Sequence, residues 1–145
     1  MRIAFTTTFD AQDVHNWSGT PFYMSSALAK TDIDLHYIGS LERKLPKYFK
    51  FKQFCSKLIA DQRVSPRFNI IAAKYYSEQT ARQLEKLSVD AIVSPLINPI
   101  AYLDTNKPII LWTDALYAAL LGFYPPFAHH SADTRPHTRA QPAHI

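Results

Sequence analysis

Cysteine and glycine are scarce in this sequence, which has one cysteine, Cys55, and three glycines. A single cysteine excludes an internal disulfide and a cysteine-rich zinc site, and it favours a reducing compartment. The Gly-x-Gly-x-x-Gly fingerprint of dinucleotide-binding folds is absent. No apolar run approaches the ~18 residues of a membrane span, and the N-terminus lacks the long apolar region of a signal peptide. These absences make a cytoplasmic protein the expectation.

What the sequence does contain is enough apolar material for a folded core. Hydrophobic residues make up 47% of the 145 residues, which is too many for a chain that is disordered throughout. This length fits one domain and leaves little room for a second. The formal net charge of +4 is mild, so it does not by itself point to a nucleic-acid partner.

Hydrophobic periodicity predicts that strands and helices alternate along the chain. Alternation of this kind is typical of an α/β fold, here a Rossmann-like parallel sheet with helices on both faces. We expect strands over 3–7, 33–38, 89–94 and 108–113, and helices over 20–30, 46–60, 67–87, 99–103 and 115–121.

The last residues, 128–145, differ from the rest in composition. Their only large aliphatic residue is Ile145, so the segment has no apolar face to bury and is expected to be disordered. Four of the six histidines lie there: His129, His130, His137 and His144. No rigid element fixes their geometry, so we expect no metal site.

Ligands of open α/β sheets bind at the carboxyl ends of the strands. Ser18 and Gly19 follow the first expected strand and stand at the entry of a helix, which Thr20 is expected to cap and Pro21 to open. Free backbone N–H groups and the helix dipole favour an anion at such a position. The alternative is that Gly19 serves only a turn.

The second candidate, Asp114, comes where the fourth expected strand ends and a helix begins. Two compatible interpretations are open, because an N-cap aspartate and a carboxylate directed into the ligand crevice both occupy this place. Trp17 and Trp112 are tryptophans of the kind that more often pack than bind sugars, although Trp17 lies in a loop.

A basic stretch is the third candidate, with Lys47, Lys50 and Lys52 among six cations in fifteen residues. Aromatic residues interleave with these cations. The stretch is interpreted either as the solvated face of an amphipathic helix or as a surface that contacts an anionic membrane. Contact with nucleic-acid phosphates is possible in principle but is not favoured.

Several segments in order resemble the N-terminal domain of bacterial family 4 glycosyltransferases, which have the GT-B fold. The resemblance spans residues 1–127. The segments are Met1-Arg2-Ile3-Ala4-Phe5, Asn16-Trp17-Ser18-Gly19-Thr20-Pro21, Val89 to Ser94, Pro99-Ile100-Ala101-Tyr102-Leu103, Lys107 to Ala115, and Gly122-Phe123-Tyr124-Pro125.

The resemblance implies a domain that binds the sugar acceptor, facing a second domain that binds a nucleotide-sugar. It implies transfer of a hexose to a hydroxyl acceptor, such as a lipid or a cell-envelope glycan, without a cofactor or bound metal. Asp114 would be the catalytic residue that touches the sugar or acceptor. Substrate contacts would come from His15, Asn16, Ser18, Gly19 and Thr20.

Length and resemblance together predict an incomplete enzyme. Residues 1–127 are expected to form the acceptor-side domain and residues 128–145 a disordered tail of the kind that a frameshift would produce, and the donor domain is expected to be missing. The expected location is cytoplasmic or peripheral at the inner face of the membrane. The alternative is a standalone Rossmann-like module that docks on a membrane or nucleic acid through its basic helix.

Overall fold

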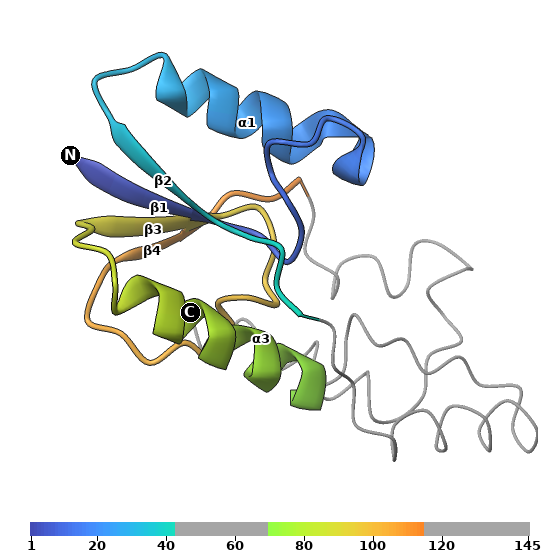
Figure 1. Cartoon of the computed structure of the whole chain (residues 1–145), viewed down its shortest axis with the longest axis vertical. Helices are drawn as coiled ribbons and strands as arrows, with labels where there is room; N and C mark the ends of the chain where they lie inside the picture. Colours follow the sequence, from blue (N-terminus) through green and yellow to red (C-terminus); the bar gives the residue numbers. More distant parts are fainter. Residues whose placement is uncertain (43–69, 115–145) are drawn as a thin grey trace, which may run out of the picture.

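The computed structural model describes residues 1–42 and 70–114, and within them a parallel sheet forms the centre (Figure 1). The strands are β1 (Arg2–Thr6), β2 (Asp34–Ile38), β3 (Ala91–Ser94) and β4 (Ile109–Leu111). Their order across the sheet is β2-β1-β3-β4. All the pairings are parallel, with Ala4 between His36 and Ile92 in register. The predicted parallel α/β sheet is therefore confirmed.

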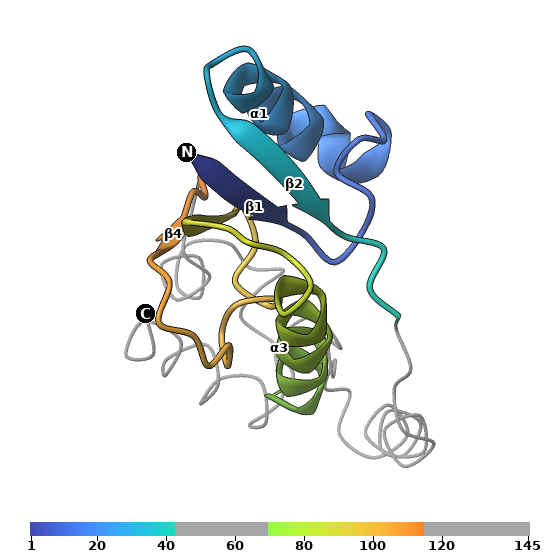
Figure 2. The ribbon, with the colours of Figure 1, turned by 60° about the vertical axis from the view of Figure 1, so that its left-hand side comes forward.

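Helices cover both faces of this sheet, as Figures 1 and 2 show. The helix α1 (Thr20–Ala29) follows a short 3-10 turn, η1 (Asn16–Gly19), and lies over one face. The helix α3 (Ile70–Leu84) lies over the other face. The crossover from β1 to β2 thus runs on the opposite side from the one that leads back to β3, as right-handed connections require in a sheet of this order.

Side-chain alternation along the strands divides the core in two. Ala4, Ile38 and Ile92 are buried on the α3 face, together with Ala72 and Tyr76 of the helix. The other cluster lies on the α1 face and consists of Ile3, Phe5, Ala11 and Val93, with Met24 and Leu28 packed against it. From Ile3 in β1 and from Ala91 in β3, both strands are buried on both faces, and they are apolar from there up to their last residues, Thr6 and Ser94.

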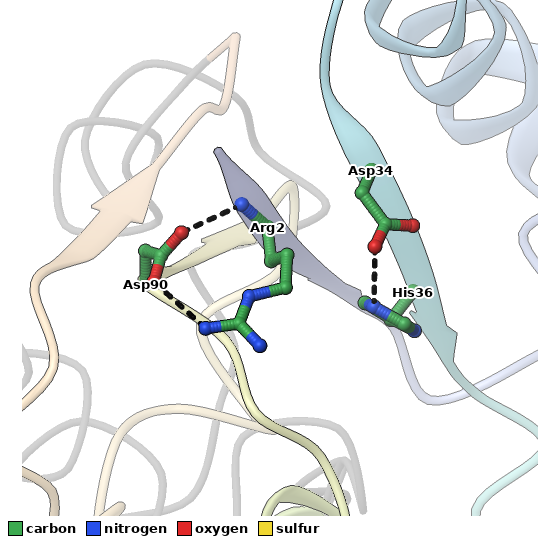
Figure 3. A network of polar contacts seen from close by, with 4 residues as sticks. All are labelled: Arg2, Asp34, His36 and Asp90. Atoms are coloured by element: carbon green, nitrogen blue, oxygen red, sulfur yellow. Dashed lines mark hydrogen bonds and ion pairs between the residues drawn. The ribbon is translucent and has the colours of Figure 1, made fainter.

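Figure 3 shows two polar contacts of the sheet. The backbone N–H of Arg2 donates to Asp90 Oδ2 at 2.8 Å, and the Arg2 guanidinium lies 3.5 Å from Asp90 Oδ1. His36 Nε2 lies 3.4 Å from Asp34 Oδ2 on β2. The first contact joins the start of β1 to the segment before β3, and the second stays within one strand.

Two sequence predictions need correction. The short helix expected over 99–103 is a set of turns, in which Ile100 and Ala101 both donate to the carbonyl of Ile97. Pro99 has no N–H, and the Tyr102 N–H donates to Ser77 Oγ at 3.1 Å rather than to a helical carbonyl. The strand expected over 108–113 is also shorter, because β3 ends at Ser94 before Pro95.

Some predictions lie outside the described residues. These are the helices expected over 46–60 and 115–121, the tail over 128–145, and Cys55.

Candidate functional site

The switch in strand order lies between β1 and β3. The chain leaves β1 to form β2 on one side of it, and later returns to form β3 on the other side. Loops that follow the two strands therefore diverge at their carboxyl ends, which is where open α/β sheets bind ligands. The residues at this point are buried hydroxyl residues, namely Thr6, Thr7 and Ser94.

The hydroxyl of Ser94 links the carboxyl ends of β1 and β3. Its hydroxyl oxygen lies 2.8 Å from the carbonyl oxygen of Thr6 and 2.6 Å from that of Leu96, and it accepts the Leu96 N–H at 3.2 Å. Thr6 Oγ1 is fully buried and has no hydrogen-bond partner in the part of the chain that the structure describes. The buried side chains at the switch point are therefore polar, and the Ser94 hydroxyl is held by hydrogen bonds to the backbone.

The loop after β1 is held by its own aspartates. Asp10 Oδ1 accepts the Gln12 N–H, and Asp13 Oδ1 accepts the His15 N–H, both at 2.9 Å. Asn16 Nδ2 lies 3.0 Å from the Asp10 carbonyl oxygen and 3.2 Å from Asp13 Oδ2. The amide of Asn16, predicted to contact substrate, is thus used inside the loop, whereas His15 beside it is exposed.

A left-handed turn follows this loop. Trp17, Ser18 and Gly19 have φ angles of 46°, 56° and 79° in succession. For residues other than glycine this conformation costs roughly 1–2 kcal/mol each. A side chain at Gly19 would stand 3.1 Å from the ring of Tyr23 and 3.2 Å from the Val14 carbonyl oxygen. The turn presents Trp17 and Ser18 to solvent and buries Gly19.

The start of α1 corrects one expectation. Gly19, not Thr20, is the N-cap residue, and no side chain caps the helix there. The Thr20 N–H already donates to the Trp17 carbonyl oxygen, and Pro21 has no N–H. The first two helical positions therefore offer no free donor, so an anion at this helix start would have to be bound by other groups than the N–H groups of Thr20 and Pro21.

Asp114 lies past the end of β4 and is exposed. Its Oδ1 lies 3.4 Å from the hydroxyl of Thr113. Trp112, two residues earlier, is 47% exposed, and Trp17 is 39% exposed. Neither tryptophan is therefore buried in the core, which is the packing role that the sequence favoured over sugar binding. The exposure of Trp112 is indicated by the alternation along β4. Ile109 and Leu111 pack against the α3 cluster, whereas Ile110 and Trp112 are exposed.

Most of the predicted site residues lie at one end of the sheet, where the strands have their carboxyl ends. His15, Asn16, Ser18, Gly19 and Thr20 follow β1, and Asp114 follows β4. Because β3 lies between these strands, their ends are about 10 Å apart, twice the spacing of neighbouring strands. Sequence reasoning missed Thr6 and Ser94, which are the last residues of the neighbouring strands β1 and β3. The basic residues Lys47, Lys50 and Lys52 lie outside the described part of the chain.

Within residues 1–42 and 70–114, no group of three or more His, Cys, Asp or Glu side chains is placed to hold a metal ion. Among the same residues, no helix has the length and apolar character needed to cross a membrane. A scan against protein-family models, a search of curated proteins and a search of solved structures each found no match to this chain.

Proposed function

We propose that this chain is the acceptor-side domain of a glycosyltransferase that transfers a hexose from a nucleotide-sugar to a hydroxyl acceptor. One observation carries the proposal: the turn that exposes Trp17 and Ser18, and the exposed Asp114 carboxylate, both follow the carboxyl ends of strands, β1 and β4, on either side of β3. The ordered motifs that resemble family 4 enzymes include both segments.

The side chains at this edge suit a carbohydrate. An exposed carboxylate such as that of Asp114 accepts hydrogen bonds from sugar hydroxyls, and a charged acceptor strengthens such bonds. An indole such as that of Trp17 offers a flat apolar surface with a polar edge, which matches the apolar and hydroxyl-bearing surfaces of a sugar ring. The hydroxyl of Ser18 adds a donor and an acceptor beside that indole.

The left-handed turn supports a binding role for Trp17. Strained backbone is often found at functional sites, because the surrounding structure must hold it in place. In this turn the left-handed conformation exposes Trp17 and Ser18 to solvent, while Gly19 packs close to Tyr23. The acceptor would therefore meet a preformed surface.

Tryptophan fluorescence tests acceptor binding directly, because the chain has only two tryptophans. The Trp112→Phe variant leaves Trp17 as the single reporter. Titration with monosaccharides, disaccharides and soluble lipid-linked saccharide analogues should quench or blue-shift its emission for one acceptor class. Asp114→Asn in the same background should raise the Kd of that acceptor about tenfold, as expected for the loss of one charged hydrogen bond of roughly 1.5 kcal/mol.

Asp32→Asn provides the matched control, since Asp32 is an exposed carboxylate that lies before β2, at the opposite end of the strands. It should leave the titration unchanged. A Trp17 signal that no saccharide alters, or an equal loss from Asp32→Asn and Asp114→Asn, would contradict the proposal.

Transfer itself should require a donor domain. Incubated alone with UDP- and GDP-hexoses and the acceptor that binds, the chain should release no nucleoside diphosphate above background. Release at a steady rate would show that the chain is a complete enzyme. Location at the inner face of the membrane, and membrane docking through Lys47, Lys50 and Lys52, stay predictions that no described residue supports.

A further inference from the structure

The two edges of the described sheet differ in character. At one edge, β2 carries Asp34 and His36, polar side chains of the kind that discourage edge-to-edge association. At the other, β4 is Ile109–Leu111, followed by Trp112, and has no charged residue. The nearest charges are Lys107 before it and Asp114 after it. The β4 edge therefore lacks the usual protection against pairing with another strand.

The hydrogen-bond pattern shows which backbone groups of β4 point away from the sheet. Ile92 donates to the Pro108 carbonyl, and Trp112 donates to the Ser94 carbonyl, both at 2.9 Å. Because bonding alternates along a parallel ladder, the N–H and C=O groups of Ile109 and Leu111 are directed outward. No described residue pairs with that outer edge.

One face of β4 is also left uncovered by the described residues. Pro108, Ile110 and Trp112 are successive positions on this face and all three are exposed, Ile110 to 50% and Trp112 to 47%. The side chain of Ile110 is on the opposite face of the sheet from those of Ile109 and Leu111, which pack against the α3 cluster. Exposed large apolar side chains in a row beside open backbone groups are typical of an association surface.

We propose that β4 pairs with β4 of a second copy of this chain, antiparallel, about a two-fold axis through Ile110. In this register Ile109 lies opposite Leu111 of the other copy, so the outward groups of both residues exchange hydrogen bonds. Ile110 lies opposite its own counterpart, and Trp112 lies opposite Pro108. The two half-sheets join into one continuous sheet.

Two features favour a second copy over another partner. The exposed row Pro108, Ile110, Trp112 is complementary to itself when reversed, which a two-fold interface requires. The antiparallel arrangement also brings Lys107 of each copy opposite Thr113 of the other, one residue from Asp114, so unlike charges lie near each other at both ends. This attraction acts between strand ends and needs no ion pair.

Cysteine cross-linking tests the register. In a Cys55→Ser background, Ile110→Cys places two thiols at a directly opposed pair about 4.5 Å apart between Cα atoms, which is within the range of a disulfide. Trp112→Cys is the matched control, on the same face and similarly exposed. In the proposed register, position 112 of one copy lies four residues along the strand from position 112 of the other copy, so the two are at least ~13 Å apart. Mild oxidation of the full chain should give covalent dimers from Ile110→Cys only.

Oligomeric state provides the second measurement. Light scattering on the full chain should give twice the monomer mass, and Ile110→Lys should give the monomer mass with unchanged circular dichroism. Tyr23→Lys, which replaces a more exposed apolar side chain on α1, should stay dimeric. In Trp17→Phe protein, the emission of Trp112 should shift to the red on dilution.

Three results would overturn the proposal. The first is a monomeric chain at all concentrations up to ~100 µM, a range in which specific interfaces assemble. The second is equal cross-linking of the Ile110→Cys and Trp112→Cys variants. The third is slow amide exchange of Ile109 and Leu111 in a monomer, which would show that this chain covers its own edge. None of these results depends on saccharide binding by Trp17.

Discussion

Gly39 shows how one residue positions the loops around the candidate site. A side chain added there would overlap with the carbonyl oxygen of Phe9. The same carbonyl accepts the hydroxyl of Thr7, and the Leu41 N–H donates to the Thr8 carbonyl at 3.1 Å. The segment after β2 therefore runs directly against the segment after β1, with no space for even one methyl group.

Gly39→Ala should destabilise the protein by about 1–3 kcal/mol, because backbone must move to admit the methyl group. Urea unfolding followed by circular dichroism measures this loss. Ser40→Gly is the neighbouring control. Ser40 has a φ of 52°, so glycine relieves strain there and should leave stability within about 1 kcal/mol of the wild type. Equal losses from both variants would refute the close approach at Gly39.

At the scale of elements, β3 is held to its neighbours by a side chain as well as by its ladder. The Ser94 hydroxyl contacts the carbonyl oxygens of Thr6 and Leu96 and accepts the Leu96 N–H. On the other side of the same loop, Ser77 Oγ of α3 accepts the Tyr102 N–H and lies 3.4 Å from the Asn98 carbonyl oxygen. Two buried serines thus fix the connection between β3 and β4, which has no regular helix of its own.

Ser94→Ala should lower the free energy of unfolding by about 1–3 kcal/mol, since it leaves buried backbone groups without their partner. The transition should stay cooperative, with an unchanged dependence on urea. Ser26→Ala tests a half-buried serine on α1 and should change stability by less than about 0.5 kcal/mol. If the two substitutions cost the same, the Ser94 contacts contribute nothing specific.

At the scale of the whole molecule, the Arg2–Asp90 contact joins positions 88 residues apart in the chain. The backbone N–H of Arg2 is the main cause that lowers the pKa of Asp90, and the Arg2 charge adds to it, while partial desolvation opposes the shift. A carboxyl group whose pKa is lowered by folding stabilises the protein above its ordinary value of 3.8. That contribution is lost as the pH falls through the lowered pKa.

Asp90→Asn should therefore melt at a lower temperature than the wild type at pH 7, and the gap should close as the pH falls below 3.8. Thermal unfolding at a series of pH values and constant ionic strength measures the gap. Asp32→Asn, at an exposed carboxylate, should show no gap at any pH. A gap for Asp90→Asn that persists unchanged in acid would rule out the carboxylate as its source.

The parts of the fold that were predictable depend on neighbours in sequence. The strands β1, β2 and β3 were placed to within about two residues, because apolar runs and alternation reflect burial on one or two faces. The short helix over 99–103 was not predictable in this way. Its periodicity is helical, but Pro99 and the distant Ser77 redirect its backbone hydrogen bonds. The exposure of Trp112 follows from the alternation along β4, which is a local pattern, whereas the exposure of Trp17 depends on the left-handed turn.

The sequence by itself determined that the chain forms a parallel α/β sheet, and it located candidate residues at the strand ends, since patterning and strand-end position are local properties. Only the tertiary structure decided which strands are neighbours and which backbone groups are occupied. It places the Ser94 hydroxyl against the end of β1 at the switch point and engages the Asn16 amide and the Thr20 N–H in hydrogen bonds. Among the described residues, none pairs with the outer edge of β4. The physical reason is that hydrogen-bond partners and solvent exposure depend on contacts between distant segments, and local sequence does not encode these contacts directly.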